Sequence, residues 1–233
     1  MESLMYGNIG NMGIISWMLL LIPLIFSLWA QAKVKGTFSK FSKVNCKNGI
    51  TAERVVKQLL IDAGVTDVKI ERIKGNLTDH YDPRSKTIRL SEPVYGHSSI
   101  SAIGVAAHET GHAIQHNVGY APLSLRSAFV PIATIGSQAA IPLVIAGMFF
   151  GSFLIQLGIA LFAGAVVFQL ITLPVEFNAS SRALQMVESG RVLSYDETDS
   201  ARKVLNAAVL TYVASAAVVA QLIRLLLIYG RRN

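Results

Sequence analysis

The chain has 233 residues, of which 52% are hydrophobic and only 15% are charged. Ordinary soluble domains carry roughly 25% charged residues, so this composition excludes a purely water-soluble protein. Charged residues are absent from positions 3–32, 127–175 and 204–223. A membrane-spanning helix needs about 20 apolar residues, so these three segments have room for one, two and one spans respectively.

The first apolar segment runs from Ile14 to Ala30 and is predicted to be a transmembrane anchor within residues 1–30. A signal peptide is disfavoured because no Lys or Arg precedes the segment, whereas a group of lysines follows it. By the positive-inside rule, this asymmetry places the N-terminus outside and residue 31 onward in the cytoplasm. The lysines are Lys33, Lys35, Lys40, Lys43 and Lys47.

Residues 31–127 are predicted to form a soluble catalytic insert. Thr51 and Gly64 are typical start and stop signals for a helix between them. Residues 68–75 and 86–91 alternate apolar with polar side chains, and a turn-rich segment joins them, which predicts a β-hairpin. Residues 98–115 begin with serines and continue with Ala, Val and Ile, which predicts a second helix.

The second half of the chain is predicted to cross the membrane three times. Residues 128–174 are expected to form a two-helix membrane hairpin, 175–205 a polar loop or helix, and 206–230 the last transmembrane helix. This topology puts residues 31–127 and 174–203, with 18 of the 21 basic residues, on one side. We therefore expect a multi-pass protein of the plasma (inner) membrane whose site faces the cytoplasm, although Arg231 and Arg232 fall on the opposite side.

The basic balance of 21 Lys and Arg against 14 Asp and Glu does not predict a nucleic-acid partner. Basic loops beside membrane spans are what the positive-inside rule produces. The lone cysteine, Cys46, can form no internal disulfide, which fits a reducing compartment.

The most informative motif is HExxH, formed by His108, Glu109 and His112. Histidines at positions i and i+4 of a helix project from one face and can bind one metal ion. The glutamate beside the first histidine can act as general base toward a water on that metal. Coincidence is the alternative, but the predicted helix is the context that this motif requires.

A catalytic zinc site needs a third protein ligand, and Glu176 is the best candidate. It ends the 49-residue uncharged segment, so a membrane hairpin would return it to the side that holds the two histidines. A structural acid at a helix end is the alternative role for Glu176. His116 follows His112 by four residues, and a straight helix would carry it about 6 Å too far along the axis to share a zinc ion with His108.

These motifs resemble the YugP-type neutral zinc metallopeptidases. The similarity rests on HETGH before a hydrophobic hairpin, followed by Glu176-Phe-Asn-Ala-Ser-Ser-Arg, and covers nearly the whole chain. More distantly, the chain is similar to HtpX and the CAAX prenyl endopeptidases. The resemblance implies that Glu176 is the third zinc ligand, Ala179 its small neighbour and Arg182 a basic residue. Ser180 stands where the wider group has an aspartate that orients a zinc histidine.

We therefore expect a mainly α integral membrane protein with about four transmembrane helices and a small α+β, gluzincin-like peptidase domain, in which a zincin-like HExxH helix accompanies a β-hairpin. The expected cofactor is Zn²⁺, and the expected function is that of a zinc-dependent endopeptidase acting on membrane or unfolded proteins, with Glu109 as general base. Membrane lipid and a protein or peptide substrate are expected partners; a homo-oligomer or a regulatory membrane partner stays open. Candidates for orienting a ligand or stabilising the oxyanion are Ser180, Arg182, His97, Tyr81 and Tyr95.

Three alternatives remain. A catalytically inactive, zinc-stabilised membrane scaffold would have no need of Glu109. A site-2-type intramembrane protease would carry an LDG-type motif, which the sequence lacks. A channel or transporter has little support, because the predicted spans hold no charged residue except Arg224 near an end.

Overall fold

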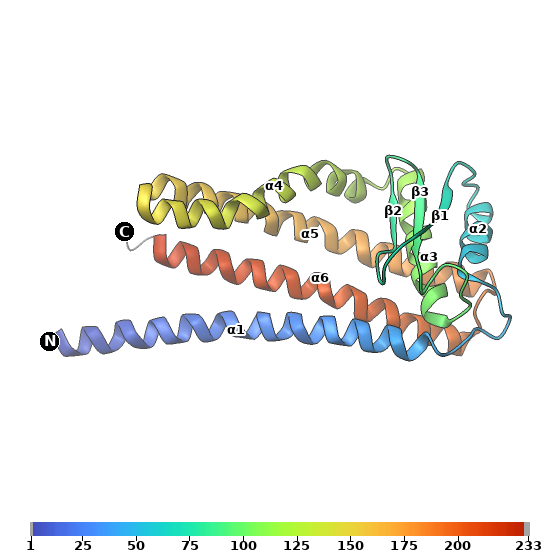
Figure 1. Cartoon of the computed structure of the whole chain (residues 1–233), viewed down its shortest axis with the longest axis horizontal. Coiled ribbons are helices and arrows are strands. Elements are labelled where there is room, and N and C mark those ends of the chain that lie inside the picture. Colours follow the sequence, from blue (N-terminus) through green and yellow to red (C-terminus); the bar gives the residue numbers. More distant parts are fainter. Residues whose placement is uncertain (1, 231–233) are drawn as a thin grey trace. The chain divides into compact units, whose positions relative to one another are not determined.

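The computed structural model of the chain describes residues 2–230, with side chains for residues 21–165, 167–221, 223 and 224. It is mostly helical and carries one small sheet (Figure 1). The elements are, in order, α1 (Glu2–Phe41), α2 (Ala52–Asp62), β1 (Lys69–Ile73), β2 (His80–Asp82), β3 (Thr87–Ser91), α3 (Ile100–Asn117), α4 (Ala121–Phe150), α5 (Ser152–Ser189) and α6 (Tyr195–Gly230).

The chain divides into two compact units. The first comprises residues 1–31, 126–171 and 211–233, and the second comprises residues 32–125 and 172–210. Helices α1, α4, α5 and α6 therefore contribute residues to both units. All the predicted site residues fall in the second unit.

Among the residues whose side chains are described, three helices are long and apolar enough to cross a membrane: α4, α5 and the part of α6 from Tyr195 to Gln221. The predicted first span, residues 14–30, lies within α1, but the side chains of residues 14–20 lie outside the described part of the chain, so this span stays a prediction. Helix α5 continues past the predicted span to Ser189, and α6 begins at Tyr195 rather than near residue 206.

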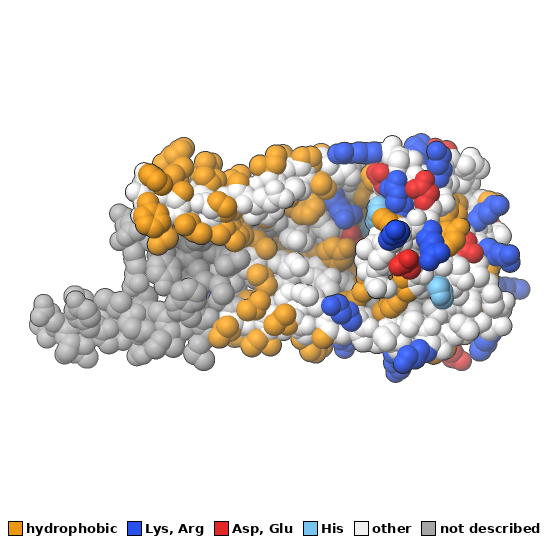
Figure 2. Space-filling model, in the orientation of Figure 1, with side chains coloured by type: hydrophobic (Ala, Val, Ile, Leu, Met, Phe, Trp, Pro, Cys, Tyr) orange, Lys and Arg blue, Asp and Glu red, His pale blue; other side chains and the backbone are white. Residues whose placement is uncertain are grey.

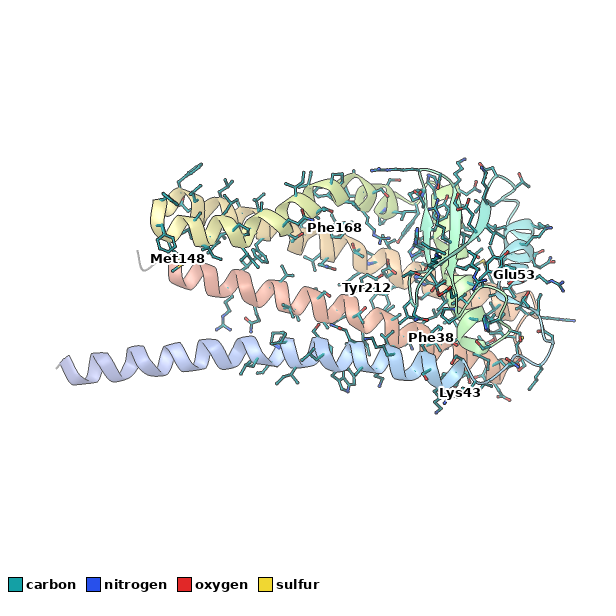
Figure 3. The ribbon with its side chains drawn as sticks, viewed as in Figure 1. Phe38, Lys43, Glu53, Met148, Phe168 and Tyr212 are labelled. Atoms are coloured by element: carbon teal, nitrogen blue, oxygen red, sulfur yellow. The ribbon has the colours of Figure 1, made fainter. Side chains whose placement is uncertain are left out.

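In the first unit, α4 and α5 are joined at Gly151, whose φ of 120° reverses the chain in a single residue. Close approach of the two helices depends on small residues: a Cβ on Gly147 would lie 2.7 Å from the amide nitrogen of Ile155. Large apolar side chains point outward near this turn, including Met148 (Figure 3), which is 73% exposed. Figure 2 shows hydrophobic side chains spread over these two helices, as a lipid-facing surface requires.

In the second unit, the strand order is β1-β3-β2. The predicted hairpin between residues 68–75 and 86–91 is wrong, because β1 and β3 pair in parallel, with Lys69 opposite Thr87. The connecting segment is long enough to hold a third strand, β2, which returns the chain and pairs antiparallel with β3. Asp79 anchors this return by accepting hydrogen bonds from the amide and the hydroxyl of Ser91, both at 2.7 Å.

Helix α3 is the central element of the second unit, and 14 of its 18 residues are buried. One group of its side chains, including Ala102 and Ala106, belongs to an apolar cluster with residues of α2 and β3. Another group, including Ile103 and Ala107, belongs to a cluster with residues of α5 and α6. Because α3 is packed on both sides, the side chains that it carries are held in fixed positions.

Two sequence-predicted helices are confirmed. Helix α2 spans Ala52–Asp62, and Gly64, with a φ of 68°, follows it as the predicted stop. Helix α3 begins at Ile100 after Ser99, whose side chain accepts a hydrogen bond from the amide of Ala102 at 3.3 Å.

Candidate metal centre

Helix α3 provides two histidines on one face. His108 and His112 are one turn apart, and their ring centroids lie 4.7 Å from each other. His112 is buried and His108 is half-buried. Both imidazoles therefore lie in a protected position from which they can bind the same metal ion.

Helix α5 brings a carboxylate to the two histidines. Glu176 is 1% exposed, and its Oε2 lies 3.2 Å from His108 Nε2 and 3.6 Å from His112 Nε2. Ligand atoms of the three residues all lie within 4.8 Å of one another. The three residues predicted as ligands thus come together in one cluster, although 63 residues separate His112 from Glu176 in the sequence.

The spacing of this cluster fits a zinc ion. Two atoms bound at about 2.1 Å to a tetrahedral zinc lie roughly 3.4 Å apart, and the two nitrogen-to-oxygen distances of 3.2 and 3.6 Å lie on either side of that value. Two imidazole nitrogens with one carboxylate oxygen form the donor set of many catalytic zinc sites, and the fourth position stays available for water or substrate. His108, His112 and Glu176 could therefore hold a zinc ion.

The approach of α5 to α3 depends on a glycine inside the HExxH motif. A Cβ on Gly111 would lie only 2.7 Å from the carbonyl oxygen of Ala179, a residue that is 0% exposed. Any larger residue at this position would separate the two helices. Gly111 and Ala179 thus set the distance across which Glu176 reaches the histidines.

Each histidine makes a further contact through its Nδ1. The Ser180 hydroxyl lies 3.1 Å from His108 Nδ1. Ser180 is the residue that stands where the wider group has an aspartate that orients a zinc histidine. The amide oxygen of Gln115 lies 3.0 Å from His112 Nδ1. Gln115 was not identified from the sequence, although its spacing of three residues from His112 places it on the same helix face.

Glu109, the predicted general base, is 7% exposed. Burial raises the pKa of its carboxyl to about 7, and the negative charges of Glu176 and Asp79 act in the same direction. His108 and the backbone of Tyr81 act in the opposite direction. A carboxyl whose pKa lies near neutrality can both accept and return a proton, which is what general acid–base catalysis requires.

The remaining candidates lie in different surroundings. The Tyr81 hydroxyl lies 2.8 Å from Nδ1 of His116, which joins β2 to the end of α3. Arg182 donates from Nε to the side-chain oxygen of Asn178 at 2.8 Å. His97 precedes α3 in the sequence, and its carbonyl accepts a hydrogen bond from the amide of Ala52 at the start of α2. Its ring Nδ1 lies 3.1 Å from the carbonyl oxygen of Tyr95.

Comparisons with known proteins show the family of the chain. A family model described as "Putative neutral zinc metallopeptidase" matches residues 16–230. The chain is also similar to a Bacillus subtilis (strain 168) protein named "Putative membrane protease YugP", with 50% identity over 205 residues that cover 87% of this chain and 91% of the relative. No solved structure matches the chain.

Proposed function

Since the chain belongs to the neutral zinc metallopeptidase family, we propose that it is a membrane-embedded, zinc-dependent endopeptidase whose metal is held by His108, His112 and Glu176. The observation that carries the proposal is the cluster itself: two Nε2 atoms and one carboxylate oxygen converge at distances suited to zinc, with a buried glutamate next in sequence to one ligand.

The proposed chemistry divides between the metal and the chain. Zinc, when bound, would act as a Lewis acid that polarises the scissile carbonyl and lowers the pKa of a water molecule. Glu109 accepts the proton of the attacking water and passes it to the leaving amine.

Tyr81 is the proposed donor to the oxyanion. Burial, followed by the charges of Asp67 and Asp82, raises the pKa of its hydroxyl to about 12, so the hydroxyl keeps its proton at neutral pH. Tyr81 and Arg182 each have a hydrogen-bonding partner, His116 Nδ1 and Asn178 respectively, so Tyr81 must leave His116 in order to donate to the oxyanion. His97 belongs to the surroundings of α2.

We propose that the substrate is an extended segment of an unfolded or membrane protein, bound along β2. The strand order puts β2 at an edge of the sheet and β3 in its centre. Strand β3, which directly precedes α3, already has a partner on each side. An edge strand can pair with any extended chain through backbone hydrogen bonds, which gives broad sequence tolerance.

The proposed orientation places the site at the cytoplasmic face of the plasma (inner) membrane. Its support is the concentration of basic residues in the segments that form the second unit, and the three apolar helices that can anchor the chain in lipid. Membrane lipid and the protein substrate are the proposed partners, with a homo-oligomer or a regulatory membrane protein as further candidates.

The test is Glu109→Gln, with Glu188→Gln as the matched control because Glu188 is exposed on α5. Glu109→Gln should keep its zinc and lower kcat/KM toward an unfolded protein by at least about 100-fold, whereas Glu188→Gln should match the parent. Unchanged cleavage in Glu109→Gln would refute the role of Glu109. Zinc binding without cleavage in the parent protein would favour the inactive, zinc-stabilised scaffold.

A further inference from the structure

Gln115 is a polar side chain buried beside the candidate metal centre. It is 0% exposed, and both ends of its amide make hydrogen bonds. The oxygen lies 3.0 Å from His112 Nδ1. The nitrogen donates to the carbonyl oxygen of Val175 at 2.9 Å and to the side-chain oxygen of Asn178 at 3.0 Å. A buried amide this well satisfied has one energetically acceptable orientation.

The direction of these hydrogen bonds follows from Arg182. A guanidinium nitrogen can only donate, so Asn178 must present its oxygen to Arg182 Nε, 2.8 Å away. The same oxygen faces Gln115, which must therefore turn its NH₂ group toward it. The backbone carbonyl of Val175 is also an acceptor and imposes the same orientation on Gln115.

This orientation determines the tautomer of His112. With its NH₂ group committed to Asn178 and Val175, Gln115 presents its oxygen to His112 Nδ1. That nitrogen must then carry the ring proton, because two acceptors would repel each other. A neutral imidazole protonated at Nδ1 has its lone pair on Nε2, the atom that lies 3.6 Å from the carboxylate oxygen of Glu176.

His108 lacks such a constraint. Its Nδ1 faces the hydroxyl of Ser180, which can either donate or accept, so this contact alone permits both tautomers. The two ligands of the same helix are thus supported differently: the tautomer of one is set by a chain of defined donors and acceptors, and the other rests on an adaptable hydroxyl.

We propose that Gln115, Asn178 and Arg182 are positioning residues that hold His112 in the tautomer and ring orientation required for zinc. This inference rests on the proposed function, because it concerns the same metal centre. It assigns a role to Asn178 and Arg182 within the segment that also carries Glu176, so that α5 supplies both a ligand and the support of a ligand on α3. Removal of comparable supporting groups typically lowers metal affinity by 10- to 100-fold.

The test compares two substitutions of Asn178 in the full chain in detergent. Asn178→Asp keeps an oxygen that can accept from both Gln115 and Arg182, so it should retain the parent's zinc affinity. Asn178→Ala removes that oxygen and should weaken zinc binding by about 10-fold, measured by competition with a chromophoric chelator. Ser181→Ala is the control, because Ser181 is exposed on the same helix, and it should bind zinc as the parent does.

A second readout avoids both metal and activity. Nitrogen-15 NMR of labelled histidine in the metal-free protein should show His112 protonated at Nδ1 in the parent and in Asn178→Asp. In Asn178→Ala, Gln115 keeps one acceptor, the carbonyl of Val175, instead of two, so a detectable share of the Nε2-protonated tautomer should appear. If Asn178→Ala does not fold, Arg182→Met tests the same idea from the half-exposed end of the chain of hydrogen bonds. Its expected loss of zinc affinity is smaller than that of Asn178→Ala, because Asn178 keeps its side-chain oxygen and Gln115 therefore keeps both of its acceptors.

The result that would overturn the inference is a folded Asn178→Ala, or Arg182→Met in its place, with the parent's zinc affinity and a single His112 tautomer. Failure of the proposed function would look different. A parent protein that cleaves nothing would contradict the endopeptidase, while the tautomer and zinc measurements would still test the role of Gln115, Asn178 and Arg182.

Discussion

Gly111→Ala tests the close packing of α3 against α5. The added Cβ would lie 2.7 Å from the carbonyl oxygen of Ala179 and 3.2 Å from its Cα. Because the obstacle is buried backbone, relief requires movement of the helix. Ordinary contact begins near 3.4 Å, so the helices must separate by about 0.7 Å. Metal–ligand distances tolerate only about 0.2 Å, and Glu176 lies one turn from Ala179.

The expected result is a loss of zinc affinity of at least about 10-fold with a modest change in the stability of the metal-free protein. Overpacking costs about 1–3 kcal/mol, but alanine is favoured over glycine inside a helix by about 1 kcal/mol, so the two effects partly offset each other. Zinc affinity should therefore report the displacement of Glu176 more sensitively than thermal unfolding does.

Gly104→Ala is the matched control on the same helix. Its Cβ would meet the Cβ of Ala201 at 3.5 Å, which is ordinary van der Waals contact. This variant should bind zinc as the parent does and unfold at the same or a slightly higher temperature. Chelator competition and thermal unfolding of the metal-free proteins provide both measurements. Equal zinc affinity in Gly111→Ala and Gly104→Ala would refute the packing argument.

Two further predictions concern Ser180 and Asp82. Ser180→Ala should weaken zinc binding by about 10-fold, because it removes the group that faces His108 Nδ1. Ser180→Asp should restore zinc binding, because a carboxylate holds that nitrogen more firmly than a hydroxyl does. Equal zinc affinity of the two variants in chelator competition would contradict this prediction. Hydrogen bonds from the Ser85 hydroxyl and the Arg84 amide, followed by that from Arg89, lower the pKa of Asp82 from 3.8 to about 2. Ionised Asp82 therefore contributes stability above pH 3.8 that is lost as the pH falls toward 2, so the difference in melting temperature between the parent and Asp82→Asn should shrink from pH 5 to pH 2. A difference independent of pH would count against that contribution.

The sequence was sufficient to predict helices α2 and α3 and the two histidines of the candidate metal centre because their signals are local. Ser99 and Gly64 stand at helix ends, and the i, i+4 spacing of His108 and His112 has one geometric consequence on a helix. Glu176 was found through the membrane topology, since an even number of crossings returns the chain to the same side.

The sheet could not be predicted in the same way. Alternation of apolar and polar residues identifies a strand but does not say which strand it pairs with or in which direction. Strand β2 has three residues and includes part of the segment that looks like a turn, and its place depends on the contact between Asp79 and Ser91. Such a contact becomes visible only when the two segments are seen together.

The supporting residues of the site fall between these cases. Gln115 and Asn178 lie at helical spacings from His112 and Arg182, but a glutamine or asparagine on a helix usually has a simpler role at the surface. Only the burial of Gln115 and the donor and acceptor pattern around it distinguish the two. Local spacing made the contacts possible without specifying them.

The most direct test of the metal centre is metal analysis of the purified protein beside Glu176→Ala. The parent should hold about one zinc per chain, as a three-ligand catalytic site requires. Glu176→Ala, with only the two histidines of α3 left, should lose nearly all of it after dialysis. Full retention of zinc in Glu176→Ala would contradict the assignment of the third ligand and the proposed function built on it.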